Sequence, residues 1–382
     1  MSATTVYINH TSAFFPNEPV SNDEMELYLG FIDNRPSKSK KIVLRNNGII
    51  NRYYALTKDQ KSTHTNAQMT ALAVRALFDN DAKQLKEIEL LSCGTSSPDQ
   101  MMPSHGVMTH GWLPETRSIE VVSPSGVCCA GMHAFKYAYL AIKAGDVKKA
   151  VATGSERFSG LLVADVFEEE AHLLAAMEDN PFIAFQKDFL RWMLSDGASA
   201  FFMTDKPNEK GHSLRIEWIE GVSYANELDT CMYMGGEKLA DGSLKGFMDF
   251  TSKEIMTHSV FSIKQDITLL SNHVVQLGGK KIKEIFETKG LTANDIDYFL
   301  PHISSEFFKN KIYDMIQEYG GGIPYEKWFI NLYTVGNVGA ASSYLMIDEL
   351  FKSGKLKKGE KILVLVPESA RFSYMYALLT VC

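Results

Sequence analysis

The stretch from Ser123 to Tyr139, Ser-Pro-Ser-Gly-Val-Cys-Cys-Ala-Gly-Met-His-Ala-Phe-Lys-Tyr-Ala-Tyr, joins two predicted elements. The β-branched run at 118–122 before it predicts a buried strand. The apolar spacing after it predicts a helix that ends at Gly145. The two cysteines therefore lie on a tight turn at a helix N-terminus. Free N–H groups and the positive end of the helix dipole favour a thiolate there, so we expect a lowered thiol pKa.

A single cysteine is weak evidence for catalysis, because free cysteines are most often small apolar residues of the core. The turn strengthens the nucleophile interpretation, since a reactive thiol needs an electropositive and accessible position. A decision between the two depends on partner residues elsewhere in the chain.

Composition narrows the class of protein. The 382 residues are 45% hydrophobic and 22% charged, which is typical of a globular protein with a large core. A net charge of −7 argues against non-specific nucleic-acid binding. The five cysteines have neither C-x-x-C nor zinc spacing, so we expect no metal site and a reducing compartment. The absence of a signal-like start or an 18-residue apolar run predicts a cytoplasmic protein without a membrane span.

Two segments of the chain repeat one pattern, Lys-x-Gly-x-apolar-Lys-Lys. They are Lys143–Lys149 and Lys352–Lys358, and each ends a predicted helix and precedes a predicted strand. The separation from 143 to 352 is 209 residues, which places the cysteine turn opposite Gly336–Ser342 in a second half. Chance similarity of two helix–glycine–strand units is the alternative to duplication. We expect two similar halves, 1–205 and 206–382, with a helical insertion at 158–193.

A duplicated fold would bring distant residues together. Cys128 or Cys129, His302 after a predicted strand, and Asn337 in the repeated turn form a Cys/His/Asn set, which is a composition used for nucleophilic catalysis. Each has an ordinary alternative, such as a hydrogen-bonded core histidine or a turn asparagine. We also expect residues 223–260 to be a loop that forms a lid or tunnel wall, and the helical region at 262–289 to be broken or bent at Gly278-Gly279.

At these residues the sequence resembles the β-ketoacyl-acyl carrier protein synthase III group of the thiolase superfamily. The motifs that carry the resemblance are Cys129-Ala-Gly, Leu300-Pro-His302 and Gly336-Asn337-Val-Gly-Ala-Ala-Ser; weaker matches are at 94–99, 154–156 and 195–198. The resemblance implies an α/β fold of five layers, α-β-α-β-α, built from two pseudo-equivalent halves, and a homodimer. It also selects Cys129 over Cys128, by the Cys-Ala-Gly match.

The resemblance implies an acyltransferase that needs no cofactor. Cys129 would take an acyl group from a thioester, and His302 and Asn337 would bind the second thioester's oxygen as it becomes an enolate. The backbone N–H of Cys129 would form half of an oxyanion hole, and the N–H of Ser369 or Ala370 the other half. The substrates would be thioesters of acyl carrier protein or coenzyme A. Lys309 and Lys311 are candidates for docking an acidic carrier, although a solvated lysine face is the commoner role.

Near the C-terminus the chain departs from the family pattern. Pro367-Glu-Ser-Ala-Arg371 replaces a glycine-rich loop, and Arg371 would pair with Glu156 beside the nucleophile to bind substrate or transfer a proton, unless the two form a surface ion pair. Such a polar rim resembles the ketosynthase subgroup that makes dialkylresorcinol or cyclohexanedione precursors from a β-ketoacyl and an α,β-unsaturated acyl thioester. The alternatives are a decarboxylative synthase using malonyl-acyl carrier protein, an acyltransferase relative, and a non-catalytic partner subunit.

Overall fold

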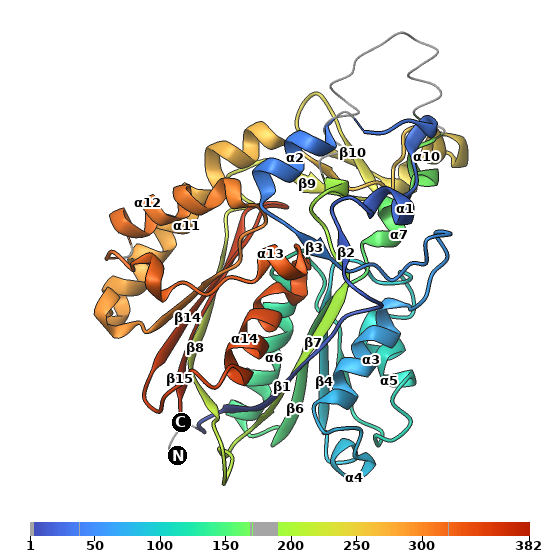
Figure 1. The fold of residues 1–382 in the computed structure, drawn as a ribbon. Helices are drawn as coiled ribbons and strands as arrows, with labels where there is room; N and C mark the ends of the chain where they lie inside the picture. Colours follow the sequence, from blue (N-terminus) through green and yellow to red (C-terminus); the bar gives the residue numbers. More distant parts are fainter. Residues whose placement is uncertain (1–3, 38, 169, 171–189, 320) are drawn as a thin grey trace.

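The computed structural model describes residues 4–37, 39–168, 170, 190–319 and 321–382 (Figure 1). Nine strands form one mixed sheet in the order β13-β14-β15-β8-β1-β7-β6-β4-β5. Their bounds are β1 Tyr7–Phe14, β4 Leu90–Thr95, β5 Glu120–Val122, β6 Lys149–Glu156, β7 Gly197–Thr204, β8 Leu214–Ser223, β13 Tyr298–Pro301, β14 Lys361–Glu368 and β15 Ser373–Val381.

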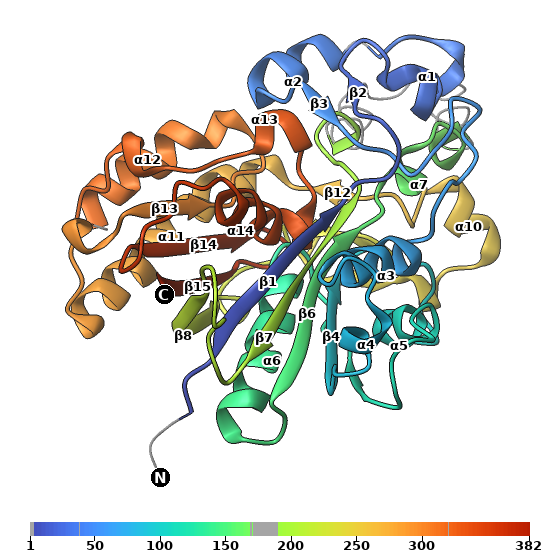
Figure 2. The ribbon, with the colours of Figure 1, turned by 60° about the horizontal axis from the view of Figure 1, so that its bottom comes forward.

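The sheet consists of two similar parts that meet at β1 and β8. In the N-terminal part β4 runs parallel to β6, and the pairs β6–β7 and β7–β1 are antiparallel. The C-terminal part repeats this pattern with β13, β14, β15 and β8. The two parts are joined by two residue pairs between β1 and β8, Tyr7 with Arg215 and Ile8 with Leu214. Figure 2 shows β1 at this junction.

Helices α6 (Ala130–Ala144) and α14 (Ser342–Lys352) lie side by side between the two parts of the sheet (Figure 1). Their contact is close because Gly131 has no side chain: a Cβ there would lie 2.2 Å from the carbonyl oxygen of Ala340. Tyr344 donates a hydrogen bond of 2.8 Å to the carbonyl of Gly131, and its ring stacks on Phe201. The two helices of the predicted repeat therefore form the central layer.

The outer layers complete the predicted order. Helices α3 (Asn66–Ala76) and α5 (His105–Gly111) cover the N-terminal part of the sheet, and α11 (Ile267–Lys289) and α12 (Lys309–Tyr319) cover the C-terminal part (Figure 1). The five-layered α-β-α-β-α architecture is thus confirmed. The other α-helices of the described residues are α1 Met25–Leu29, α2 Lys40–Asn47, α4 Ala82–Leu85, α7 Ser159–Leu162, α10 Ser252–Thr257 and α13 Leu332–Val335.

Three local predictions need correction. The strand before the cysteine turn, β5, is at the edge of the sheet and half exposed, whereas a buried strand was predicted. The predicted loop at 223–260 contains short strands β9 (Met232–Tyr233), β10 (Gly236–Lys238) and β11 (Leu244–Gly246) as well as α10. Helix α11 is continuous through Gly278-Gly279. Most of the predicted helical insertion, 171–189, lies outside the described residues.

Within the described ranges, none of the helices has both the length and the apolar character that crossing a membrane requires.

Candidate active site

One apolar cavity brings together three of the residue types that the sequence singled out. It has a volume of about 900 Å³ including its open mouth, and it lies between the strand ends and helices α11 and α12. Cys128, His302 and Asn337 line it, together with Val127, Ser369 and apolar side chains such as Leu194, Leu270, Phe308, Ile312 and Met315. A mostly apolar pocket with a few convergent polar groups is typical of a small-molecule site.

The two cysteines have different surroundings. Cys128 lines the cavity and is 9% exposed, whereas Cys129 is fully buried and is not among the cavity residues. The Sγ of Cys129 donates to the carbonyl of Val366 at 3.4 Å. Helix α6 begins directly after Cys129, as the sequence predicted. The cysteine that lines the cavity is therefore the neighbour of the one that the Cys-Ala-Gly motif selects.

The predicted lowering of the thiol pKa is wrong for both cysteines. Burial raises the pKa of Cys129 well above its ordinary value, and the carboxylate of Glu368 raises it further. Burial raises the pKa of Cys128 as well, with further contributions from Glu368 and Glu156. The helix N-terminus does not compensate, because an apolar environment disfavours the charged thiolate and the nearby carboxylates repel it.

His302 lies at the carboxyl end of β13, where its backbone N–H donates to Leu365 of β14 at 2.7 Å. Burial lowers the pKa of its imidazole to about 4, so the ring is neutral at pH 7. Its Nε2 atom is buried and has no hydrogen-bond partner among the described residues. Buried polar atoms are almost always paired, and an orphaned one at a cavity indicates a place for a ligand atom.

Asn337 is held by its backbone. Its N–H donates to Met193 at 3.1 Å and its carbonyl accepts from the N–H of Ser195 at 2.9 Å. Gly336 before it has φ of +74°, and a Cβ there would lie 2.8 Å from the Cβ of Ser195, so the turn requires glycine. The side-chain Oδ1 accepts from Gly339 at 3.0 Å. This bond fixes the direction of the amide at the cavity wall.

Two buried side chains that the site interpretation missed support the segment that clamps Asn337. Asn47 and Arg52 both donate to the carbonyl of Trp192, at 2.9 and 3.3 Å. Arg52 is fully buried. Both residues belong to the run Arg45-Asn-Asn-Gly-Ile-Ile-Asn-Arg52, which contains an Asn-Gly turn signal, but nothing in the sequence indicated which segment they would hold.

Glu156 is part of the scaffold between the two halves. Its fully buried carboxylate accepts from the N–H of Ala340 in the second half at 3.0 Å, and from the hydroxyls of Ser96 and Ser97 in the first half at 2.8 and 2.6 Å. Burial raises its pKa to about 7. The predicted pair with Arg371 is not formed, because Arg371 Nε instead donates to the carbonyl of Leu228 at 3.0 Å.

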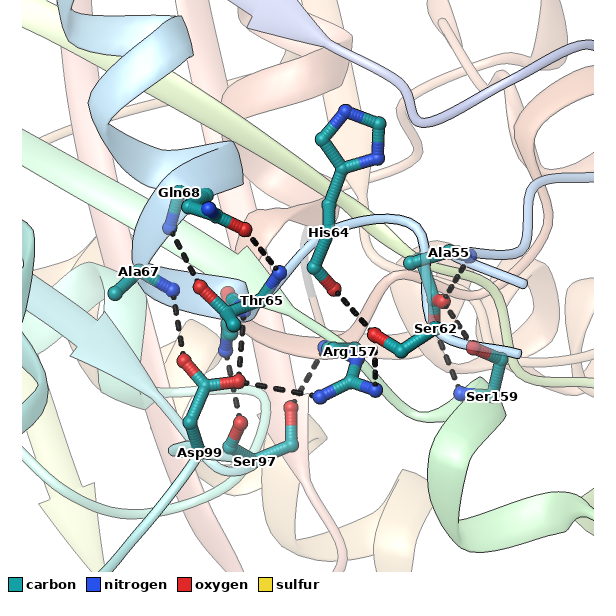
Figure 3. A network of polar contacts seen from close by, with 12 residues as sticks. Ala55, Ser62, His64, Thr65, Ala67, Gln68, Ser97, Asp99, Arg157 and Ser159 are labelled. Carbon is teal, nitrogen blue, oxygen red and sulfur yellow. Dashed lines mark hydrogen bonds and ion pairs between the residues drawn. The ribbon is translucent and has the colours of Figure 1, made fainter. Parts of the chain in front are cut away.

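The weaker motifs of the sequence also build this scaffold. Asp99 accepts from the N–H groups of Asn66 and Ala67 at the start of α3, and it pairs with Arg157 at 3.3 Å (Figure 3). Asp196 accepts from the N–H groups of Ala55 and Ser159. The segments at 94–99, 154–157 and 195–198 thus interlock around Glu156.

Of the remaining predicted residues, Ser369 lines the cavity, and Lys309 and Lys311 belong to helix α12. The hydroxyl of Ser369 accepts from Gln265 at 3.0 Å. Lys309 is bound by Glu306 at 3.2 Å and by the hydroxyl of Tyr333 at 2.9 Å. Lys311 lies over the ring of Phe307, 4.4 Å from its centroid. Lys309 is therefore less available to a partner than the sequence suggested.

Comparison with known proteins agrees with this fold. Residues 286–368 match the family model of the C-terminal region of 3-oxoacyl-[acyl-carrier-protein] synthase III. The β-ketoacyl-[acyl-carrier-protein] synthase III of Clostridium acetobutylicum is 23% identical over 376 residues, which is 94% of each chain.

Solved structures share the fold over nearly the whole chain. The tetronic acid condensing enzyme AbyA1 superposes with a TM-score of 0.74 at 15% identity, covering 98% of this chain and 99% of that one. The 3-oxoacyl-[acyl-carrier-protein] synthase III of Aquifex aeolicus superposes with a TM-score of 0.69 at 18% identity, with the same coverage.

These matches support the resemblance of the sequence to the β-ketoacyl-acyl carrier protein synthase III group, since residues 286–368 match a family model of that group and the solved structures share the fold. The predicted class, an acyltransferase, agrees with what these relatives and neighbours are named for.

Proposed function

We propose that the chain joins two acyl thioesters by a carbon–carbon bond, through an acyl group bound to a cysteine of the turn at 128–129. One observation carries the proposal: a single cavity is lined by Cys128, His302 and Asn337. This composition suits acyl transfer followed by attack of an enolate.

The first half-reaction would form a thioester on the enzyme. The cysteine sulfur attacks the thioester carbonyl, the bond to the carrier sulfur breaks, and the carrier leaves as a thiol with the proton of the cysteine. Because the thiol pKa is raised by burial and by Glu368, we expect proton transfer to accompany attack rather than to precede it.

The second half-reaction would use His302 and Asn337. A neutral imidazole carries one N–H, and an amide nitrogen carries two, so both side chains can donate to an enolate oxygen. These donors stabilise an enolate more strongly in a cavity that excludes water, since fixed donors need no reorganisation when negative charge develops. The orphaned Nε2 of His302 supports this role.

Intact-protein mass spectrometry with a set of acyl thioesters tests the proposal and decides between the cysteines. The motif favours Cys129, whereas the cavity lining favours Cys128. We expect an acyl adduct on wild type that is lost in only one of Cys128→Ala and Cys129→Ala. Absence of an adduct with every carrier-bound and coenzyme A donor would favour a non-catalytic partner subunit.

For the substrates, we propose a β-ketoacyl and an α,β-unsaturated acyl thioester, which would give a cyclohexanedione or dialkylresorcinol precursor. The polar loop at 367–371 supports this pair, since Pro367 and Ser369 of the loop line the cavity where the extra keto oxygen would bind. Glu156 and Arg371, which the sequence suggested for this role, are not among the residues that line the cavity. Release of carbon dioxide from malonyl thioesters, with no ring product from the proposed pair, would indicate the decarboxylative synthase instead.

For the carrier, we propose an acyl carrier protein or coenzyme A, with Lys309 and Lys311 contributing to docking of an acidic carrier protein. Lys311→Glu is the sharper test, because changing Lys309 would also break its contacts with Glu306 and Tyr333. We expect Lys311→Glu to raise the KM for a carrier-bound substrate and to leave the KM for the coenzyme A thioester unchanged. Equal effects on both would exclude the docking role.

A further inference from the structure

Glu368 occupies the start of helix α6 with its carboxylate. The residue ends strand β14, and its Oε2 accepts from the backbone N–H groups of Val127 and Cys129, each at 2.9 Å. The side chain is buried, with 8% exposed. Two N–H donors that converge at the N-terminus of a 15-residue helix form a good anion site, and here a carboxylate of the chain itself fills it.

The anion site adjoins the candidate active site. Val127 and Cys128 line the cavity, and so does His302, whose buried Nε2 has no partner among the described residues. The resemblance assigns the N–H of Cys129 to the oxyanion hole, yet in this structure that N–H is engaged. The donor that should meet a thioester oxygen and the carboxylate that occupies it are therefore parts of one site.

We propose that Glu368 is a positioning residue that closes this anion site in the resting protein, and that it keeps the neighbouring thiols protonated until a thioester oxygen replaces it. The identity of the incoming oxygen depends on the proposed function. The contact of Glu368 with the cysteine turn does not.

A comparison with Glu156 supports a releasable contact. The two glutamates end equivalent strands, β6 and β14, and each reaches the helix start of the opposite half. Glu156 accepts from five donor groups: the hydroxyls of Thr95, Ser96 and Ser97 and the N–H groups of Ser96 and Ala340. Glu368 has two donors among the described residues, both on the cysteine turn, so fewer hydrogen bonds oppose its withdrawal.

The charged groups around Cys128 and Cys129 determine how strongly the Glu368 carboxylate affects ionisation of the two thiols. Cys128 is near the carboxylates of Glu368 and Glu156, and Cys129 is near Glu368 and Cys128 itself. His133 on α6 is also near Glu368, but burial lowers its pKa, so it does not neutralise the carboxylate at neutral pH. The imidazole of His302 is neutral as well. Among the described residues no ion pair joins Glu368 to a cation, so its carboxylate faces the turn without a paired counter-charge.

Alkylation of the full-length protein by iodoacetamide between pH 6 and 9, followed by peptide mass spectrometry, tests this inference. Glu368→Gln removes the charge but keeps an oxygen for the two N–H groups, and Glu368→Ala also opens the site. Cys382, which is partly exposed, provides an internal reference rate. We expect both variants to alkylate about tenfold faster at Cys128 or Cys129 relative to Cys382, because a fall of one pKa unit gives about ten times more thiolate.

A comparison of the two variants separates this role from simple packing. Loss of the charge accelerates alkylation in both variants, whereas loosening of the turn alone would accelerate it in Glu368→Ala, which loses the two hydrogen bonds, and not in Glu368→Gln, which keeps an acceptor oxygen. Unchanged ratios in folded variants would overturn the inference. So would a wild type in which Cys128 reacts as fast as Cys382 at pH 7.5, a measurement that needs no variant to fold. No acyl transfer is involved, so faster alkylation without any acyl adduct would contradict the proposed function alone.

Discussion

At the scale of single residues, the buried ionisable groups determine the chemistry that the cavity can perform. His302 is neutral because a charged imidazole would lose its hydration without gaining a carboxylate partner. A neutral ring suits a hydrogen-bond donor to an enolate, and it does not offer a permanent positive charge. This property also makes the residue a measurable contributor to acid sensitivity.

We predict that His302→Gln reduces the loss of stability in mild acid. The folded pKa is about 4 and the unfolded value about 6.5, so below pH 6.5 the unfolded chain binds more protons and folding is disfavoured. Between pH 7.5 and pH 5 the wild type should lose about 2 kcal/mol more than the variant. Urea unfolding at the two pH values measures the difference. The exposed His212→Gln serves as control, and an equal loss in wild type and His302→Gln would contradict the prediction.

Glu156 should have the opposite effect to His302 on the pH dependence of folding stability. Its folded pKa is raised to about 7 from 4.5, so between these values the folded protein binds the extra proton and stability falls as pH rises. Glu156→Gln keeps a neutral group among the same donors, and it should remove this decline. We expect the variant to gain stability relative to wild type at pH 7.5 compared with pH 5. Thermal melting of the wild type and the variant at both pH values measures this gain. A difference in melting temperature between the two proteins that is the same at both pH values would show that Glu156 is ionised throughout.

At the scale of secondary-structure elements, the two adjacent glycines of α11 show where sequence rules fail. Glycine weakens a helix, so Gly278-Gly279 predicted a break. The helix is continuous because both positions face neighbours: a Cβ on Gly279 would lie 2.7 Å from the ring of Tyr319, and one on Gly278 would lie 3.1 Å from the ring of Tyr374. The glycines serve close packing, which depends on partners far away in the sequence.

We therefore predict that Gly279→Ala destabilises the protein by about 1–3 kcal/mol, although alanine favours a helix by about 1 kcal/mol, because overpacking exceeds the gain in propensity. Gly111 in α5 is a matched control, because a Cβ there would have no atom within 4 Å. Gly111→Ala should be neutral or slightly stabilising in the same chemical denaturation experiment. Destabilisation of equal size in both variants would exclude the packing explanation.

Local patterns located most of the elements that carry the site. Strands β6 and β13, and helix α6 with its end at Gly145, were predicted from apolar spacing and end signals. The exposure of β5 was missed, because three β-branched residues look the same at the edge and in the middle of a sheet. The engagement of the Cys129 N–H by Glu368 was missed as well, since it joins residues 239 positions apart.

At the scale of the whole molecule, duplication explains why the site lies where it does. Both halves use the same order and directions of four strands, and β6 and β14 each end in a glutamate that reaches the other half. We propose the boundary between the halves near residue 205, between β7 and β8. The repeat of Lys143–Lys149 at Lys352–Lys358 was sufficient to predict that the cysteine turn and Asn337 face each other. The repeat did not indicate which of the two cysteines lines the cavity.

The edge of the sheet suggests how two copies associate. Strand β5 ends the sheet with unpaired backbone groups, and exposed edges of this kind are normally covered. Exposed apolar side chains lie on the segments around it: Met101, Met102, Val107, Trp112 and Leu140. Tyr137 of α6 contacts β5 through Glu120, which places this face of α6 next to the strand. We propose that the homodimer implied by the resemblance forms through this edge.

We predict that the wild type is a dimer and that Val107→Glu combined with Leu140→Glu makes it a monomer, because two buried carboxylates per subunit would lose hydration at the interface. Sedimentation equilibrium measures the mass directly. Met248→Glu is the control, since Met248 is 85% exposed and lies on the segment between β11 and α10, far from β5 in the sequence. A dimer that survives the double substitution but dissociates in the control would locate the interface elsewhere. A wild type that remains monomeric at high concentration would contradict the proposed dimer through the edge of β5.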